Sequence, residues 1–164
     1  ATAEFPPKEA VWNTAGKYRI ECRYPNDIQV IIAGGYDDIR GGTKWIGETG
    51  WVWVDRSHFD ASNKEWVETL KKGKKRVAEA EAKWAFKLMV SSNHNAQFID
   101  CIKSRQKTIT PVQVAHRSQT PGHLGYIASV VGRKLKWDAK KQEIVGDPEA
   151  AKLMSKDFRP PWRL

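Results

Sequence analysis

The sequence predicts an α+β fold in which an open antiparallel sheet of about four to six strands has helices packed on one face. Two observations support this fold class. Hydrophobic residues alternate with a period of two in the first half of the chain, and they take a helical period in the second half. Within a single domain over residues 1–164, we expect residues 1–56 to be mainly strands, residues 57–90 rich in loops and residues 91–164 mainly helices.

Residues 17–32 carry the clearest strand pattern. From residue 17 to residue 24, charged side chains alternate with a set that faces the other way, Tyr18, Ile20, Cys22 and Tyr24. Residues 25–27 read Pro-Asn-Asp, which is typical turn chemistry, and the alternation then resumes from Ile28. We therefore expect an antiparallel hairpin in this region.

A second hairpin is predicted from residues 43–47 and 51–55, with Glu-Thr-Gly at residues 48–50 as its turn. In the later strand, Trp51 and Trp53 should share one face and two valines the other. Beyond this hairpin, residues 57–90 predict a short helix around Trp66, an exposed lysine-rich loop, and a further strand at residues 84–90.

Tryptophan is unusually abundant, with eight in 164 residues. Three of them, Trp45, Trp51 and Trp53, lie on or beside the second hairpin. A sheet face that exposes several tryptophans usually marks an interface, so we expect these residues to take part in subunit packing. Packing in a small core and stacking on sugars are the alternatives.

Two of the predicted helices have simple starts. An apolar stripe over residues 98–102 follows either Asn93 or Asn95 as the first residue of a helix. Residues 147–149, Asp-Pro-Glu, begin a last short helix that runs through Met154. The remaining tail contains two adjacent prolines and is expected to be extended.

A longer helix is expected between Thr110 and Gly132. Thr110 and Gln113 have the spacing of a capping box, with proline at the first helical position. Gly132 is suited to end the helix. Pro121 interrupts the pattern, so we expect a kink or two helices, the second capped by Thr120.

The net charge is +9, which could indicate a nucleic-acid or other anionic partner. Much of the excess lies in two lysine-rich runs, at residues 71–76 and 134–141. Neither run has the interleaved aromatic residues that stack on single-stranded bases. We therefore favour solvated loops and expect no nucleic-acid partner. No apolar run approaches the length of about 20 residues that a membrane span needs.

The chain lacks the spacing of the common catalytic and cofactor motifs. Its glycine pairs do not form GxGxxG, and no P-loop, HExxH or GxSxG sequence occurs. Cys22 and Cys101 predict free thiols among apolar neighbours, and we expect no metal site. His116, Arg117 and His123 are the candidate substrate-pocket residues, because donors beside a helix irregularity could meet a polar or anionic ligand.

Several ordered blocks of the sequence resemble the C-terminal part of the glucose–fructose oxidoreductase/inositol dehydrogenase (Gfo/Idh/MocA) family. The blocks are NHNAQFIDCIKSR at 93–105, PVQVAHRS at 111–118, HLGYIA at 123–128 and GRKLKWD at 132–138. The closing GDPEA at 146–150 and RPPWRL at 159–164, the hairpin at 18–32 and GETGWVWVDR at 47–56 are similar to a bacterial branch of that family.

The resemblance implies a two-domain enzyme whose Rossmann domain, which holds NAD or NADP, would precede this chain. The α+β domain would close the substrate pocket on one side and pack against another subunit. The family's catalytic lysine lies in a Glu-Lys-Pro motif and its frequent histidine in an Asp-x-Gly-x-His motif, and neither motif occurs here. We therefore assign no catalytic or cofactor-binding residue to this chain, and expect it to be inactive alone.

The parent enzyme is thus expected to act on a sugar, a polyol or a related hydroxy compound, with this chain as its substrate-side and oligomerisation domain. A non-catalytic carbohydrate-binding or dimerisation module is the alternative. The first residues contain no basic segment followed by an apolar one, so no export signal is visible. The localisation stays open between a cytoplasmic protein, which we favour, and an exported one.

Overall fold

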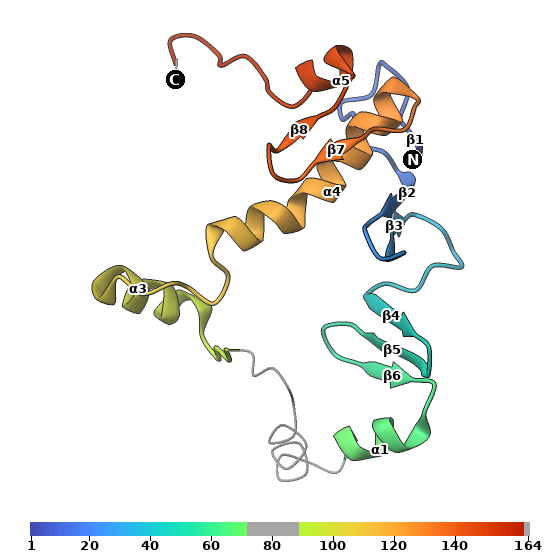
Figure 1. The fold of residues 1–164 in the computed structure, drawn as a ribbon, viewed down its shortest axis with the longest axis vertical. Helices are drawn as coiled ribbons and strands as arrows, with labels where there is room; N and C mark the ends of the chain where they lie inside the picture. The colour runs from blue at the N-terminus through green and yellow to red at the C-terminus, as the bar shows by residue number, and fades with distance from the viewer. Residues whose placement is uncertain (72–88, 163–164) are drawn as a thin grey trace. The chain divides into compact units, whose positions relative to one another are not determined.

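The computed structural model describes residues 1–71 and 89–162 of the chain. They form two compact units: the first contains Ala1–Ile39 and Thr110–Leu164, and the second Arg40–Ile109 (Figure 1). The α+β class is confirmed. Within the described residues, however, the strands are divided among three small antiparallel sheets instead of forming one larger sheet.

The first unit contains a three-stranded sheet in the order β1-β2-β3 (Thr2–Glu4, Lys17–Arg23 and Gln29–Gly34). The β2–β3 hairpin is confirmed, with Ile20 opposite Ile32. Asn26 and Asp27 make the turn in the left-handed region, which short polar side chains tolerate better than most. The alternation predicted for β2 is also confirmed, because every second residue from Tyr18 is at least half-buried while its neighbours are exposed.

Helix α4 (Val112–Val131) packs on the buried face of this sheet through Gly125. Ile20, which is 8% exposed, lies directly against this glycine. A Cβ atom at position 125 would come within 2.3 Å of the Ile20 Cδ1 atom. The helix can approach the strand this closely only because residue 125 has no side chain.

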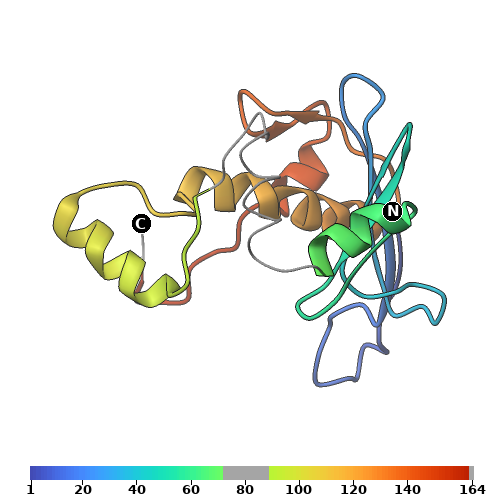
Figure 2. The same cartoon turned by 90° about the horizontal axis from the view of Figure 1, so that it is seen from below.

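The capping box expected for α4 is wrong, and so is one of the two alternatives expected at Pro121. The helix begins after Pro111, which makes no side-chain cap, so Thr110 does not form the predicted capping box. Of the kink or two helices expected at Pro121, the two helices are wrong, because α4 is one continuous helix that contains this proline (Figures 1 and 2) and Thr120 caps no second piece. Instead, the Thr120 hydroxyl donates to the carbonyl oxygen of His116, 2.9 Å away. Gly132 ends the helix with φ of 69°, as predicted.

The main core of the first unit lies on another side of α4. Strands β7 (Trp137–Asp138) and β8 (Glu143–Ile144) form a hairpin, which is followed by helix α5 (Pro148–Lys152). Ile127, Ile144 and Ala150 are buried together. Partly buried apolar residues surround them, namely Leu124, Val131, Leu135, Trp137 and Ala151. The short β7–β8 hairpin was not predicted from the sequence.

An ion-pair cluster fixes the start of α5. Asp147 is the N-cap, as predicted, and accepts from the Ala150 backbone N–H at 3.1 Å. The Arg133 guanidinium donates to both carboxylate oxygens of Asp147, at 2.8 and 2.7 Å, and to Glu149 at 2.7 Å. The hydrogen bond from Arg133, and then the one from Ala150, lower the pKa of Asp147 to about 2.

The second unit contains a sheet in the order β4-β5-β6 (Thr43–Gly47, Gly50–Val54 and Phe59–Ala61). The predicted hairpin is confirmed, and β6 adds a third strand. The Asp55 carboxylate shapes the β5–β6 connection by accepting from the backbone N–H groups of Ser57 and His58, at 2.7 and 2.6 Å. These two bonds lower the pKa of Asp55.

Helices α1 (Lys64–Lys71) and α3 (His94–Ser104) complete the described part of the second unit. Helix α1 confirms the short helix expected around Trp66. Asn93, one of the two expected starts of α3, is its N-cap and accepts from the Ala96 N–H at 3.0 Å. Most of the first lysine-rich run and of the strand expected at 84–90 lies outside the described residues. Among the described helices, none combines the length and apolar character that a membrane span requires.

We predict that Gly125→Ala destabilises the protein, whereas Gly122→Ala in the same helix does not. Overpacking against Ile20 should cost about 1–3 kcal/mol, which exceeds the gain of about 1 kcal/mol in helix propensity. A Cβ atom at Gly122 would meet nothing within 4 Å, so only the propensity gain should remain there. Urea unfolding measures both effects. Equal changes in the two variants would contradict the proposed close contact.

We also predict an acid-sensitive start of α5. Because folding lowers the Asp147 pKa from 3.8 to about 2, its stabilising effect is complete above about pH 4 and is lost as the pH falls toward 2. Asp147→Asn keeps a capping oxygen but removes the charge, so it should flatten this pH dependence. Hydrogen exchange of the Ala150 amide is the local measurement. Parallel pH profiles for the two proteins would argue against the ion pair.

Candidate functional site

The β4–β5 hairpin separates the three candidate tryptophans onto two faces of the sheet. Gly47 pairs with Gly50, and Trp45 therefore pairs with Val52. Paired residues point to the same face, so Trp45 shares its face with the valines of β5, opposite Trp51 and Trp53.

The face with Trp51 and Trp53 carries positive charge. The Trp53 side chain, 4% exposed, donates from Nε1 to the Gly41 carbonyl at 3.0 Å. The Arg40 guanidinium lies 3.1 Å from the centre of its ring and approaches Asp60 at 3.5 Å. The Lys44 ammonium lies 4.2 Å from the Trp51 ring centre. Both rings thus already have a cation against one face.

The opposite face of the same sheet is apolar and only partly covered. Trp45 is 55% exposed, and Val52, Val54 and Phe59 are also exposed. With Trp66 of α1, these side chains help to line a cavity of about 270 Å³. We call Trp45, Val52, Val54 and Phe59 the apolar sheet face. A contiguous patch of this kind typically marks a surface that a partner covers.

The three candidate donors lie on α4 in the first unit. His116, Arg117 and His123 are all exposed. Because the helix is unbroken, His116 and His123, two turns apart, lie on the same side of it. None of the three lines the cavity beside the apolar sheet face or the cavity between the N-terminal loop and α4. Within residues 1–71 and 89–162, no group of three or more potential ligands could hold a metal ion.

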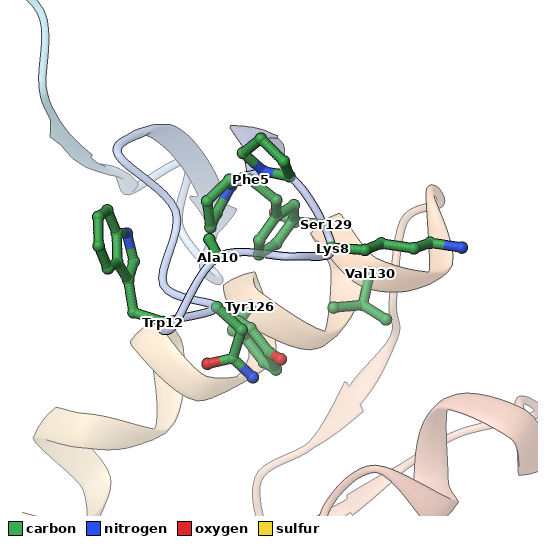
Figure 3. Close-up of a pocket in the computed structure, with 10 residues that line it drawn as sticks. Phe5, Lys8, Ala10, Trp12, Tyr126, Ser129 and Val130 are labelled. Carbon is green, nitrogen blue, oxygen red and sulfur yellow. The ribbon is translucent and has the colours of Figure 1, made fainter.

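A second cavity, of about 440 Å³, lies between the N-terminal loop and α4, and sequence reasoning missed it (Figure 3). The loop contributes residues from Phe5 to Asn13 and the helix contributes Tyr126, Ser129 and Val130. The Phe5 and Tyr126 rings meet edge to face, with centroids 6.0 Å apart and an angle of 79° between their planes. We call this cavity the loop cleft. Its sequence signals are Phe-Pro-Pro at residues 5–7 and the isolated Trp12.

The two cysteines are both free and half-buried. Burial raises the pKa of the Cys22 thiol, so this thiol is protonated at neutral pH and is a poor nucleophile. The Cys101 thiol approaches the Lys107 carbonyl oxygen at 3.4 Å. The burial of Cys22 and the contact of Cys101 with Lys107 indicate that both thiols have structural roles.

A comparison with protein-family models matches residues 8–164 to the C-terminal alpha/beta domain of an oxidoreductase family, Gfo/Idh/MocA. The chain belongs to this family. The match spans parts of both compact units, so the family's C-terminal domain includes both. Searches of curated proteins and of solved structures found no match.

Membership in the Gfo/Idh/MocA family implies NAD or NADP as the cofactor of the complete enzyme. The described residues do not fit a dinucleotide. Gly34 and Gly35 follow β3, but they lead into a loop and then into strand β4, while Gly41 and Gly42 directly precede that strand. A dinucleotide site instead needs a glycine-rich turn from a strand into a helix N-terminus. No step of hydride transfer is therefore assigned to these residues.

Proposed function

We propose that this chain is the substrate-side and oligomerisation domain of an NAD(P)-dependent oxidoreductase that acts on a sugar, a polyol or a related hydroxy compound. The observation that carries the proposal is the match of residues 8–164 to the C-terminal domain of the Gfo/Idh/MocA family. In this proposal the cofactor supplies the hydride chemistry, and a preceding Rossmann domain binds it.

On the substrate side, we propose that His116, Arg117 and His123 contact the hydroxy compound. All three are exposed donors on one helix, and the two histidines lie on the same side of it. Imidazole and guanidinium groups can donate several hydrogen bonds to closely spaced hydroxyl oxygens. Their role is to bind and orient the substrate.

For oligomerisation, we propose that a second copy covers the apolar sheet face. Burial of apolar area contributes about 25 cal/mol per Å², and large aromatic side chains such as Trp45 contribute the most area. Of the three tryptophans expected at an interface, Trp45 is the one that lies on this face. Trp51 and Trp53 lie on the opposite face of the same sheet.

The proposal predicts where nicotinamide nucleotides bind. The 164-residue chain, titrated with NADH and with NADPH, should give no change in nucleotide or tryptophan fluorescence. The longer protein extended by its upstream reading frame should bind one of them. Micromolar binding by the 164-residue chain would contradict the assignment of the cofactor to another domain.

A pair of neighbouring substitutions tests the oligomer surface. Trp45→Lys places a charge on the apolar sheet face, and Ile46→Lys places the same charge on the opposite face, where Ile46 is 78% exposed. Loss of a central tryptophan typically weakens association by about 2 kcal/mol or more, which is roughly 30-fold. Analytical ultracentrifugation should therefore show dissociation of Trp45→Lys alone. A wild-type monomer, or dissociation of both variants, would contradict this choice of face.

A further inference from the structure

We infer that the loop cleft is a carbohydrate-binding site that works without the nicotinamide cofactor. This site does not depend on the proposed reaction, and none of its residues is among the donors proposed for the substrate. It also differs from the tryptophan hairpin, which the sequence had indicated as the place where a sugar could stack.

The face of the hairpin with Trp51 and Trp53 is a poor sugar platform because both rings are already engaged, and Trp45 on the other face belongs to the proposed oligomer surface. Trp53 is buried, with Arg40 over its ring, and Lys44 lies over the ring of Trp51. A sugar needs a free aromatic face on which to place its C–H groups. The loop cleft offers such faces, because Trp12 is 65% exposed and both Phe5 and Tyr126 are also exposed.

The size and the mixed lining of the cleft suit a sugar. Its volume of about 440 Å³ lies within the range of about 300–1,000 Å³ typical of small-molecule sites. Besides the rings, it is lined by Lys8 and Asn13. Within the described part of the chain, no hydrogen bond or ion pair engages the side chains of Lys8 and Asn13 or the Tyr126 hydroxyl. Figure 3 shows the Lys8 side chain extending away from the aromatic rings, so the Asn13 amide and the Tyr126 hydroxyl are the groups that can bind the hydroxyls of a ligand whose ring stacks on the aromatic side chains.

The cleft is also held in shape before any ligand arrives. The Gly16 N–H donates to the Glu4 carbonyl at 3.0 Å, which closes the base of the loop. The Ala10 N–H donates to the Pro7 carbonyl at 3.0 Å and forms a turn within it. Pro6 and Pro7 restrict the backbone of the rim, and the edge contact of Phe5 with Tyr126 joins the loop to α4. A preformed site loses less conformational entropy on binding.

The test is calorimetric titration of the 164-residue chain with glucose, myo-inositol and cellobiose, without nucleotide. We expect millimolar binding of at least one of them, accompanied in NMR spectra by a shift of the Trp12 indole signal. Trp12→Ala should weaken binding at least about tenfold, as expected when a stacking ring is lost. Trp162→Ala is the matched control, because it removes a tryptophan that is 70% exposed and lines neither cavity, so it should leave binding unchanged.

Three results would overturn the inference: no binding of any of the three compounds, binding that survives Trp12→Ala, or binding that Trp162→Ala weakens equally. Circular dichroism of each variant separates loss of binding from loss of folding. Since no nucleotide is present, failure here would leave the nicotinamide experiment above unaffected, and the reverse also holds.

Discussion

The close contact of Gly125 with Ile20 is the constraint on which the first unit depends. Around this contact, successive residues of α4 point to three different neighbours. Gly125 meets the β1-β2-β3 sheet, Ile127 joins the core formed with β8 and α5, and Tyr126 forms a wall of the loop cleft. A helix that packs against neighbours on several sides must be apolar on several sides. This explains why the apolar residues in the second half of α4 do not form a single narrow stripe.

The second unit leaves much of its apolar surface exposed. Helix α1 packs beside the apolar sheet face, yet Trp45, Val52 and Phe59 remain exposed there. In the described part of the chain only six hydrophobic residues are buried, and Trp53 is the one from this unit. So small a buried set leaves much of the available apolar area facing solvent. Coverage by further protein would stabilise such a unit, which supports the proposed association through the apolar sheet face.

The locally determined features could be predicted, and the features set by register or by distant contacts could not. Alternation identified β2 and β5, and capping side chains identified Asn93 and Asp147, because these signals lie within a few residues. The predicted turn at 48–50 was one residue too long. Since Gly47 pairs with Gly50, that single residue moves Trp45 to the other face of the sheet. The loop cleft joins segments more than a hundred residues apart, and no local pattern indicates such a contact.

The same register determines which face of the second sheet a partner can cover. Covering the Trp51 and Trp53 face would remove water from the Arg40 guanidinium and the Lys44 ammonium. Arg40 has a single carboxylate partner at 3.5 Å, and Lys44 has no ion pair within the described residues. Burying a charge without a good partner costs several kcal/mol, which would offset much of the gain from apolar area. The apolar sheet face carries no charged side chain among Trp45, Val52, Val54 and Phe59 and incurs no such penalty. Charge placement thus disfavours coverage of the Trp51 and Trp53 face and supports the proposed association through the apolar sheet face.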